Sequence, residues 1–160
     1  MRDIVRIRRA AARDAPRIAS LLRDAFAEYE QLYTKAGYKA TTPDRDEILA
    51  RMREGPLWVA VTKARIVGTA AAVHRSNGVY IRSMAVLPEA RGLGVGRRLL
   101  EKAESFAIGT GCHRLFLSTT PFLDRAIRLY ESFGFRATDA PPNDLFGTPL
   151  FTMEKLLTGS

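Results

Sequence analysis

The feature that most constrains the fold of this 160-residue chain is a run of three glycines at alternate positions, Arg91-Gly92-Leu93-Gly94-Val95-Gly96. An apolar run that ends at Leu87 precedes it, and an amphipathic run begins near Val95. Without Cβ atoms the backbone can turn sharply from a strand into a helix. Several N–H groups at the helix start can then converge on one anion. The run therefore predicts a phosphate-binding turn.

Length and composition predict one globular domain, which we expect to span residues 1–160. Apolar residues make up 46% of the chain and charged residues 26%, close to the average of globular proteins. No apolar run approaches the roughly 20 residues of a membrane span. The chain opens on Met1-Arg2-Asp3, whose mixed charge is unlike a signal peptide. We therefore expect a soluble, cytoplasmic protein with no membrane partner.

The basic balance of the chain does not by itself identify a partner. Lys and Arg number 25 against 17 Asp and Glu, a formal net charge of +8, which would attract any polyanion. Because the basic residues are spread along the chain, a nucleic-acid partner is only weakly supported. The lone Cys112 cannot form an internal disulfide, and His74 and His113 have no companion ligand at metal-binding spacing. We expect no metal site.

Local patterns in the first third predict a strand and two helices. A strand is expected at residues 4–8, followed by a helix that Asp14 caps and that runs to Phe26. Residues 28–41 have no clean period and are expected to form a helix end plus a loop. Thr42-Pro43 supplies an N-cap and a first-turn proline for a second short helix.

The remainder predicts the order strand, strand, strand, helix, strand, helix, strand, strand. Asn77-Gly78 is the strongest hairpin signal, and a left-handed cap is expected at Gly134, where the last helix ends. That helix is expected to start at Thr120-Pro121. The predicted ranges are 57–62, 66–73 and 79–87 for the antiparallel strands, 95–109 and 120–133 for the helices, and 115–118, 135–138 and 150–154 for the later strands.

The glycine run does not match two common phosphate motifs. No Lys-Ser/Thr pair follows the last glycine, as the Walker pattern requires, and Arg97 occupies the place of the third glycine of G-x-G-x-x-G. The run also follows antiparallel strands instead of opening a βαβ unit. What remains is the pattern [Gln/Arg]-x-x-Gly-x-Gly/Ala.

Two segments carry a resemblance to a known family. The first reads Met84-Ala85-Val86-Leu87-Pro88-Glu89-Ala90-Arg91-Gly92-Leu93-Gly94-Val95-Gly96-Arg97-Arg98-Leu99-Leu100. It resembles the acetyl-CoA-binding segment of the GNAT N-acetyltransferase superfamily. The second, residues 126–135, is similar to the family pattern A-x-x-[FL]-Y-x-x-x-G-F. The resemblance implies an α/β (α+β) GNAT fold, in which about four helices flank a mixed, mostly antiparallel sheet of about seven strands that is splayed into a V.

The same resemblance implies an enzyme that transfers acetyl from acetyl-CoA to a primary amine by direct attack. Tyr130 then stands at the position of the general acid that protonates the departing thiolate. N–H groups near Met84 and Ala85 on a bulged strand would hydrogen-bond the thioester carbonyl. Charge from Arg91, and from Arg97 or Arg98, would support the diphosphate. The acetyl-CoA-binding residues implied are Met84, Ala85, Val86, Arg91, Gly92, Leu93, Gly94, Val95, Gly96 and Arg97.

The chain departs from the family pattern at two places. Leu123 stands where many relatives have an Asn that binds pantetheine, and the strand before the glycine run offers Tyr80, Arg82 and Ser83 in place of a Glu base. The proton of the amine could be taken by Glu28, by Glu30 or by an ordered water.

The acceptor is expected between residues 28–41 and 141–148, a region that mixes aromatic with acidic residues and could hold a cationic amine. Its aromatic candidates are Tyr29, Tyr33, Tyr38 and Phe146. The partners implied are acetyl-CoA and an amine, and a homodimer is open. Two alternatives remain: a CoA-binding sensor of the same fold that has lost its chemistry and, more distantly, a basic nucleic-acid-binding protein.

Overall fold

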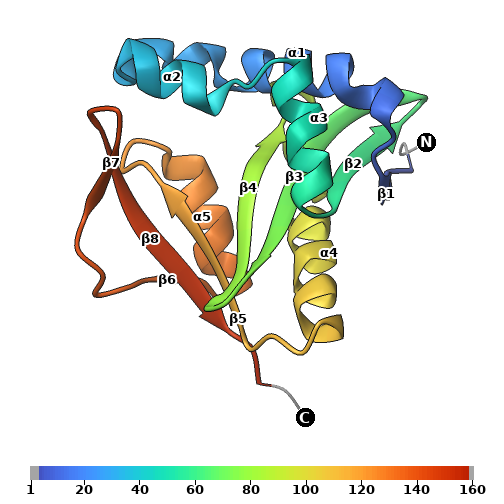
Figure 1. The fold of residues 1–160 in the computed structure, drawn as a ribbon. Coiled ribbons are helices and arrows are strands. Elements are labelled where there is room, and N and C mark those ends of the chain that lie inside the picture. The colour runs from blue at the N-terminus through green and yellow to red at the C-terminus, as the bar shows by residue number, and fades with distance from the viewer. Residues whose placement is uncertain (1–3, 159–160) are drawn as a thin grey trace.

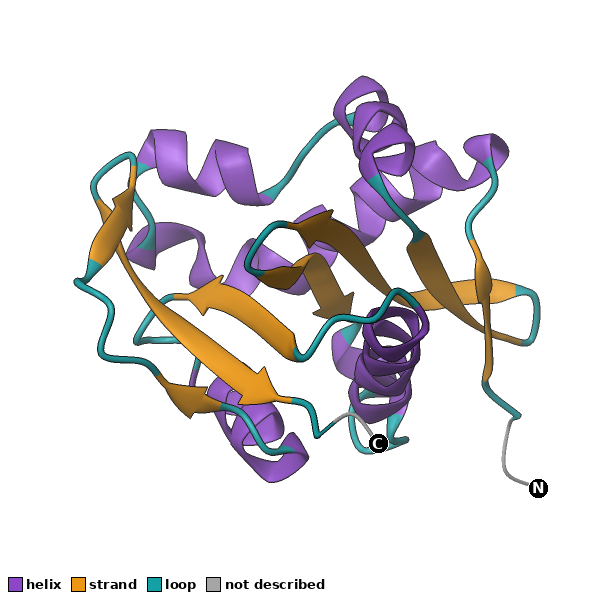
Figure 2. Cartoon of the chain, turned by 60° about the horizontal axis from the view of Figure 1, so that its bottom comes forward, coloured by secondary structure: helices purple, strands orange, loops and turns teal. Residues whose placement is uncertain are grey.

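Residues 4–158, which the computed structural model describes, form one eight-stranded sheet with helices on both sides (Figures 1 and 2). Its centre is the antiparallel run β2 (Leu57–Thr62), β3 (Arg65–Arg75) and β4 (Gly78–Val86). The first five residues of β2 and residues 67–72 of β3 are buried without alternation. Burial of successive residues requires cover on both faces of a sheet, and the helices provide that cover.

The strand order is β1-β2-β3-β4-β5-β8-β6, and β7 pairs with β8. Every pair is antiparallel except β4 with β5. The mixed, mostly antiparallel sheet predicted from the sequence is confirmed. The remaining strands are β1 (Arg6–Arg9), β5 (Arg114–Thr119), β6 (Arg136–Ala137), β7 (Asn143–Leu145) and β8 (Thr148–Leu156).

Five α-helices lie among the described residues, together with three short 3₁₀ segments. The buried Ile18 and Leu22 come from α1, and the buried Leu99 and Leu100 come from α4, the longest helix. None of the helices in residues 4–158 is long and apolar enough to cross a membrane. The bounds are α1 (Ala15–Phe26), α2 (Lys35–Thr41), α3 (Arg45–Glu54), α4 (Val95–Gly109) and α5 (Asp124–Phe133), with 3₁₀ turns at Ala12–Asp14, Ala27–Leu32 and Pro88–Ala90.

Two predicted helix starts are wrong. The N-cap of α3 is Asp44, whose carboxylate accepts from the Glu47 N–H at 2.9 Å in a capping box. The Thr42 hydroxyl instead donates to the Tyr38 carbonyl and so closes α2. Similarly, α5 begins at Asp124, and Thr120 lies in the turn before it. The segment 28–41, expected to be partly loop, is mostly helical.

The pairing of β4 with β5 stops after two residues, Val79 opposite Leu115 and Tyr80 opposite Phe116. Three residue steps of β4, from Arg82 to Ala85, oppose only two steps of β3, and Ser83 has φ +54°. These are the features of a β-bulge, which bends its strand. Figure 1 shows β4 and β5 close at one end and apart at the other. The predicted bulge and V are therefore confirmed.

Asp14 joins the first strand to the first helix through a buried carboxylate. Its oxygens accept two bonds from the Arg8 guanidinium, at 2.8 and 3.1 Å, and one from the Ala11 N–H at 2.7 Å. Asp14 stands at the N-cap position of α1, as predicted, but its side chain makes no capping bond to that helix. These bonds lower the pKa of Asp14.

We expect Asp14→Asn to lower the free energy of unfolding by about 1–3 kcal/mol at pH 7, because a buried charged acceptor is lost. An Asp with a lowered pKa stabilises the fold above its unfolded pKa, about 3.9, and this contribution is lost as the pH falls through the lower folded value. Urea unfolding should therefore show a lower free energy of unfolding for Asp14→Asn than for the unaltered protein at pH 7, and this difference should shrink below about pH 4. The control is Asp24→Asn, since Asp24 is exposed on the same helix. An equal loss of unfolding free energy in this control would contradict the stabilising role of the buried Asp14 carboxylate.

Candidate active site

The open end of the V leads into a groove of about 250 Å³ between the end of α1, the bulged part of β4, and α5. Of the predicted site residues, the structure brings Met84, Ala85, Val86, Arg91, Gly96 and Tyr130 together in this groove, whereas Gly92, Leu93, Gly94, Val95 and Arg97 do not line it. The residues that line the groove are Ala25, Phe26, Tyr29, Met84, Ala85, Val86, Arg91, Gly96, Leu123, Arg125, Ala126, Leu129 and Tyr130.

The glycine turn presents free backbone donors at the start of α4. Gly92 and Gly94 have φ of +86° and +74°, and a Cβ at either position would meet nothing within 4 Å. The first helical bond recorded for this turn runs from Arg98 N–H to the Gly94 carbonyl at 3.1 Å. The first N–H groups of α4, those of Val95, Gly96 and Arg97, have no partner within the helix, and the N-cap Gly94 has no side chain that could cap them. A helix start without a capping side chain can hold an anion.

Gly96 has a different role from the other two glycines. A Cβ there would lie 2.6 Å from a methyl group of Leu129 on α5. Its small size therefore allows α4 and α5 to approach each other. Two glycines thus shape the turn, and the third sets the helix packing beside it.

The three arginines beside the turn differ in the hydrogen bonds and ion pairs that they make with the rest of the protein. Arg91 lines the groove and forms an ion pair with Glu28 at 2.5 Å. Arg97 is 55% exposed, and its nearest carboxylate, that of Glu101, is 3.8 Å away. Arg98 donates to the Val5 carbonyl. Arg97 also lies over the Phe133 ring of α5, with 5.3 Å between its guanidinium carbon and the ring centroid. Of the three, it is the arginine without a short hydrogen bond or ion pair to residues 4–158.

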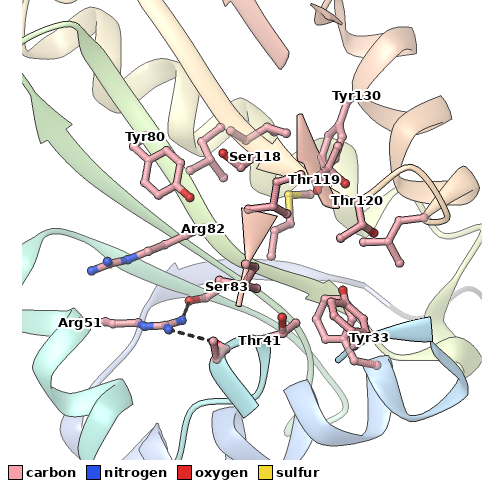
Figure 3. Close-up of a pocket in the computed structure, with 18 of the residues that line it drawn as sticks. Tyr33, Thr41, Arg51, Tyr80, Arg82, Ser83, Ser118, Thr119, Thr120 and Tyr130 are labelled. Atoms are coloured by element: carbon pink, nitrogen blue, oxygen red, sulfur yellow. Dashed lines mark hydrogen bonds between the residues drawn. The ribbon is translucent and has the colours of Figure 1, made fainter. Parts of the chain in front are cut away.

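A second space, a cavity of about 360 Å³, lies beside the groove and shares four lining residues with it: Phe26, Met84, Leu123 and Tyr130. Figure 3 shows hydroxyl and guanidinium groups directed into this cavity from several elements. The groove and the cavity therefore meet at Met84 and Tyr130. A molecule in one space would adjoin a molecule in the other.

Tyr130 is 8% exposed and packs against Phe135, with 5.9 Å between ring centroids. Gly134, in the predicted left-handed cap with φ +108°, lets the Phe135 N–H reach the Tyr130 carbonyl. Burial, followed by the neighbouring Tyr33 and Tyr80, raises the pKa of Tyr130 above its ordinary value of 10.0. The phenol therefore keeps its proton at neutral pH and can serve as a donor.

Only one of the expected acceptor-site aromatic residues lines the cavity. This is Tyr33, whose pKa is raised to about 12 by burial. Tyr29 lines the groove, Tyr38 packs behind Tyr33, and Phe146 is 67% exposed. Glu28 and Glu30, the candidate bases, line neither space.

The cavity has a basic wall that was not predicted from the sequence. It contains Arg51 from α3, Arg75 from the end of β3, and Arg82 from β4. Of these only Arg82 was noted from the sequence, and only as a departure from Glu. The buried hydroxyl of Thr119, at the end of β5, has no hydrogen-bond partner among residues 4–158.

Comparison with known proteins agrees with this geometry. The model of the acetyltransferase (GNAT) family matches residues 18–135. The uncharacterized N-acetyltransferase YjgM of Escherichia coli (strain K12) is 34% identical over 140 residues, which cover 83% of each chain. The paia N-acetyltransferase of Thermoplasma acidophilum, solved with coenzyme A, superposes with a TM-score of 0.82 at 17% identity, over 96% of this chain and 99% of that one. The protein yncA of Salmonella typhimurium, solved with its cofactor acetyl-CoA, has a TM-score of 0.74 at 26% identity, over 98% and 95%.

The fold and the family match define the class of protein: a transferase that uses acetyl-CoA. The chain belongs to the GNAT family and is an acetyl-CoA-dependent N-acetyltransferase. The resemblance stated from the two sequence segments is confirmed.

We expect Gly94→Asp to weaken acetyl-CoA binding at least about 100-fold, because a carboxylate in the open space of the turn would repel a diphosphate at short range. Isothermal titration with acetyl-CoA measures the effect. Gly111→Asp is a matched control, since Gly111 also has a positive φ, +78°, and open space beside it, but lies beyond the far end of α4. Equal affinity of the two variants for acetyl-CoA would show that the glycine turn is not part of the binding site.

Proposed function

We propose that this enzyme acetylates a primary amine by direct attack, with both substrates bound at once. The observation that carries the proposal is the meeting of groove and cavity at Met84 and Tyr130. The groove holds acetyl-CoA and the cavity holds the amine. Because the two spaces adjoin, no acyl group needs to be stored on the protein between the two halves of the reaction.

The glycine turn and the V divide the binding of acetyl-CoA between them. N–H groups at the start of α4 hold the diphosphate, assisted by the helix dipole and by Arg97. The pantetheine arm lies along β4 beyond Tyr80, where β4 no longer pairs with β5 and its backbone groups are free to bond a ligand. Leu123, in place of the family Asn, offers this arm apolar contact only.

The bulge in β4 supplies the electrostatic part of catalysis. At Ser83 and Met84 the strand leaves the regular ladder with β3, so backbone N–H groups there are free to face the groove. Such donors hydrogen-bond the thioester carbonyl and stabilise the negative charge that its oxygen gains during attack. This role depends on the main chain, so side-chain changes at Met84 should affect it less than changes in the bulge.

Tyr130 supplies the proton for the leaving group. The amine nitrogen forms a bond to the carbonyl carbon, the carbon–sulfur bond breaks, and Tyr130 donates its proton to the sulfur. Among the described residues that line the cavity none is Asp or Glu. The proton that the amine loses therefore goes to water, and water returns a proton to Tyr130.

We expect Tyr130→Phe to lower kcat about 100-fold or more, the usual worth of a general acid, with the acetyl-CoA dissociation constant nearly unchanged. The ring and its contact with Phe135 remain, so folding should be preserved. Tyr38→Phe is the control, because Tyr38 lines neither space. Turnover of Tyr130→Phe equal to that of the unaltered enzyme would exclude Tyr130 as the acid.

The pH dependence of kcat/KM gives an independent test of Tyr130. An acid must hold its proton to act, and burial raises the pKa of Tyr130 above 10.0, so the protonated form persists through the alkaline range. We expect kcat/KM to rise from pH 6 to pH 10 as the amine, whose pKa is about 10.4 for a lysine-type group, loses its proton. A loss of activity near pH 10 that is absent in Tyr130→Phe would show that the phenol titrates normally.

The overall proposal is tested by thiol release. Acetyl-CoA should yield free CoA thiol only when an acceptor amine is added, and mass spectrometry should find one acetyl group on the amine. Tight binding of acetyl-CoA without turnover of any amine in a broad panel would contradict the proposed reaction.

A further inference from the structure

One side of the cavity is basic. Figure 3 shows Arg51 and Arg82 next to each other on one side, and Tyr130 with Thr119 and Thr120 on the opposite side. Arg75 also lines the cavity, and its guanidinium lies 4.4 Å from the centroid of the Tyr80 ring. Three arginines from three different elements thus line a cavity that Tyr130 also lines.

Carboxylates of the protein compensate these charges only in part. Arg82 pairs with Glu54 at 2.5 Å, but the Glu54 side chain is 51% exposed and lines neither space. The Nε atom of Arg82 is buried without a hydrogen-bond partner among residues 4–158. A buried charged donor without a partner is costly, so an added acceptor at this place would stabilise the site.

Within the described residues, both hydrogen-bond partners of Arg51 are neutral. It donates to the Ser83 hydroxyl at 2.5 Å and to the Ala40 carbonyl at 3.4 Å. Burial and the positive charge of Arg82 lower the pKa of Arg51, against the smaller opposite effects of Glu47 and Glu54. The charged form of Arg51 is therefore held in a place that disfavours it, and a nearby anion would relieve that cost.

We propose that the acceptor amine carries an anionic group, a carboxylate or a phosphate, which Arg51, Arg82 and Arg75 bind while the amine points toward Tyr130. Guanidinium forks match the paired oxygens of such groups. A volume of about 360 Å³ suits a small molecule. This inference rests on the proposed function. It differs from the purely cationic acceptor that the sequence left open, since Glu28 and Glu30 lie outside the cavity.

The first test compares matched acceptors by thiol release. One arm sets L-aspartate, L-glutamate and L-alanine against the amides in which every carboxylate is replaced by a carboxamide; a second sets O-phosphoethanolamine against ethanolamine. We expect kcat/KM to be about tenfold or more higher for the anionic member of at least one arm, and the arm identifies the group. Amino acid amides have the less basic amine and so more of the reactive form at pH 8. Intrinsic reactivity therefore opposes the expected result in the first arm.

The second test changes the arginines. Arg75→Gln and Arg51→Gln should each lower kcat/KM for the anionic acceptor about 10- to 100-fold and change that for its neutral counterpart less than twofold. Arg51→Lys should restore part of the loss by restoring charge. The control is Arg53→Gln, an exposed arginine of the same helix that lines neither space. Acetyl-CoA affinity should be the same in all variants, because the three arginines do not line the groove.

Binding in the absence of turnover separates this inference from the proposed function. Each titration is done with CoA present. One pair compares N-acetyl-L-glutamate with the neutral N-acetyl-L-glutamine α-amide, and the other compares O-phosphoethanolamine with N-acetylethanolamine. In at least one pair the anionic ligand should bind more tightly, and Arg51→Gln should abolish this difference in affinity. If amines are acetylated but charge makes no difference in rate or binding, only the anionic acceptor is overturned. If an anionic ligand binds but no amine is acetylated, the anion site stands and the proposed reaction fails.

Discussion

The structure depends on one interruption: the parallel pairing of β4 with β5 ends after Tyr80. If the pairing continued, the backbone N–H and C=O groups of both strands would hydrogen-bond to each other, and the sheet would have no gap between β4 and β5. The extra residue of β4 near Ser83 prevents this by bending the strand. Each buried backbone group left without a partner costs about 1–3 kcal/mol, so the open V is stable only where solvent or a ligand reaches it. The groove, the cavity and the position of Tyr130 between them all follow from this separation.

Much of the fold could be predicted because its signals are local. The Asn77-Gly78 hairpin and the amphipathic run of α4 placed those elements within a residue or two. Helix starts were harder where two local signals compete. Thr42-Pro43 resembles a cap, but the capping box of Asp44 satisfies two backbone groups at once and prevails. Part of the groove lining also lies in local motifs, Arg91 and Gly96 of the glycine run and the segment around Tyr130, whereas Ala25, Phe26 and Tyr29 join it only through tertiary packing.

The basic wall could not be predicted, since no spacing in the sequence encodes it. Arg51 reaches Ser83 across 32 positions, through the packing of α3 near β4. On its own helix Arg51 looks like any charged residue of a solvated face. The same limit applies to Glu28, a candidate base by composition, whose carboxylate instead pairs with Arg91 across 63 positions. Which charges meet is decided by tertiary packing, after the elements have formed.

The positive charges at the groove and in the cavity suggest a reason for the net charge of +8. A diphosphate at the start of α4 and an anionic acceptor in the cavity would repel each other in a shared site. On the proposed function and the inferred anionic acceptor, each would meet its own cationic group, and Met84, Leu123 and Tyr130 lie where the two spaces join. Positive charge at both ends offsets the cost of bringing two anions together, and it also draws both from solution. On the proposed function, the basic composition thus reflects two small anionic substrates and requires no nucleic acid to explain it.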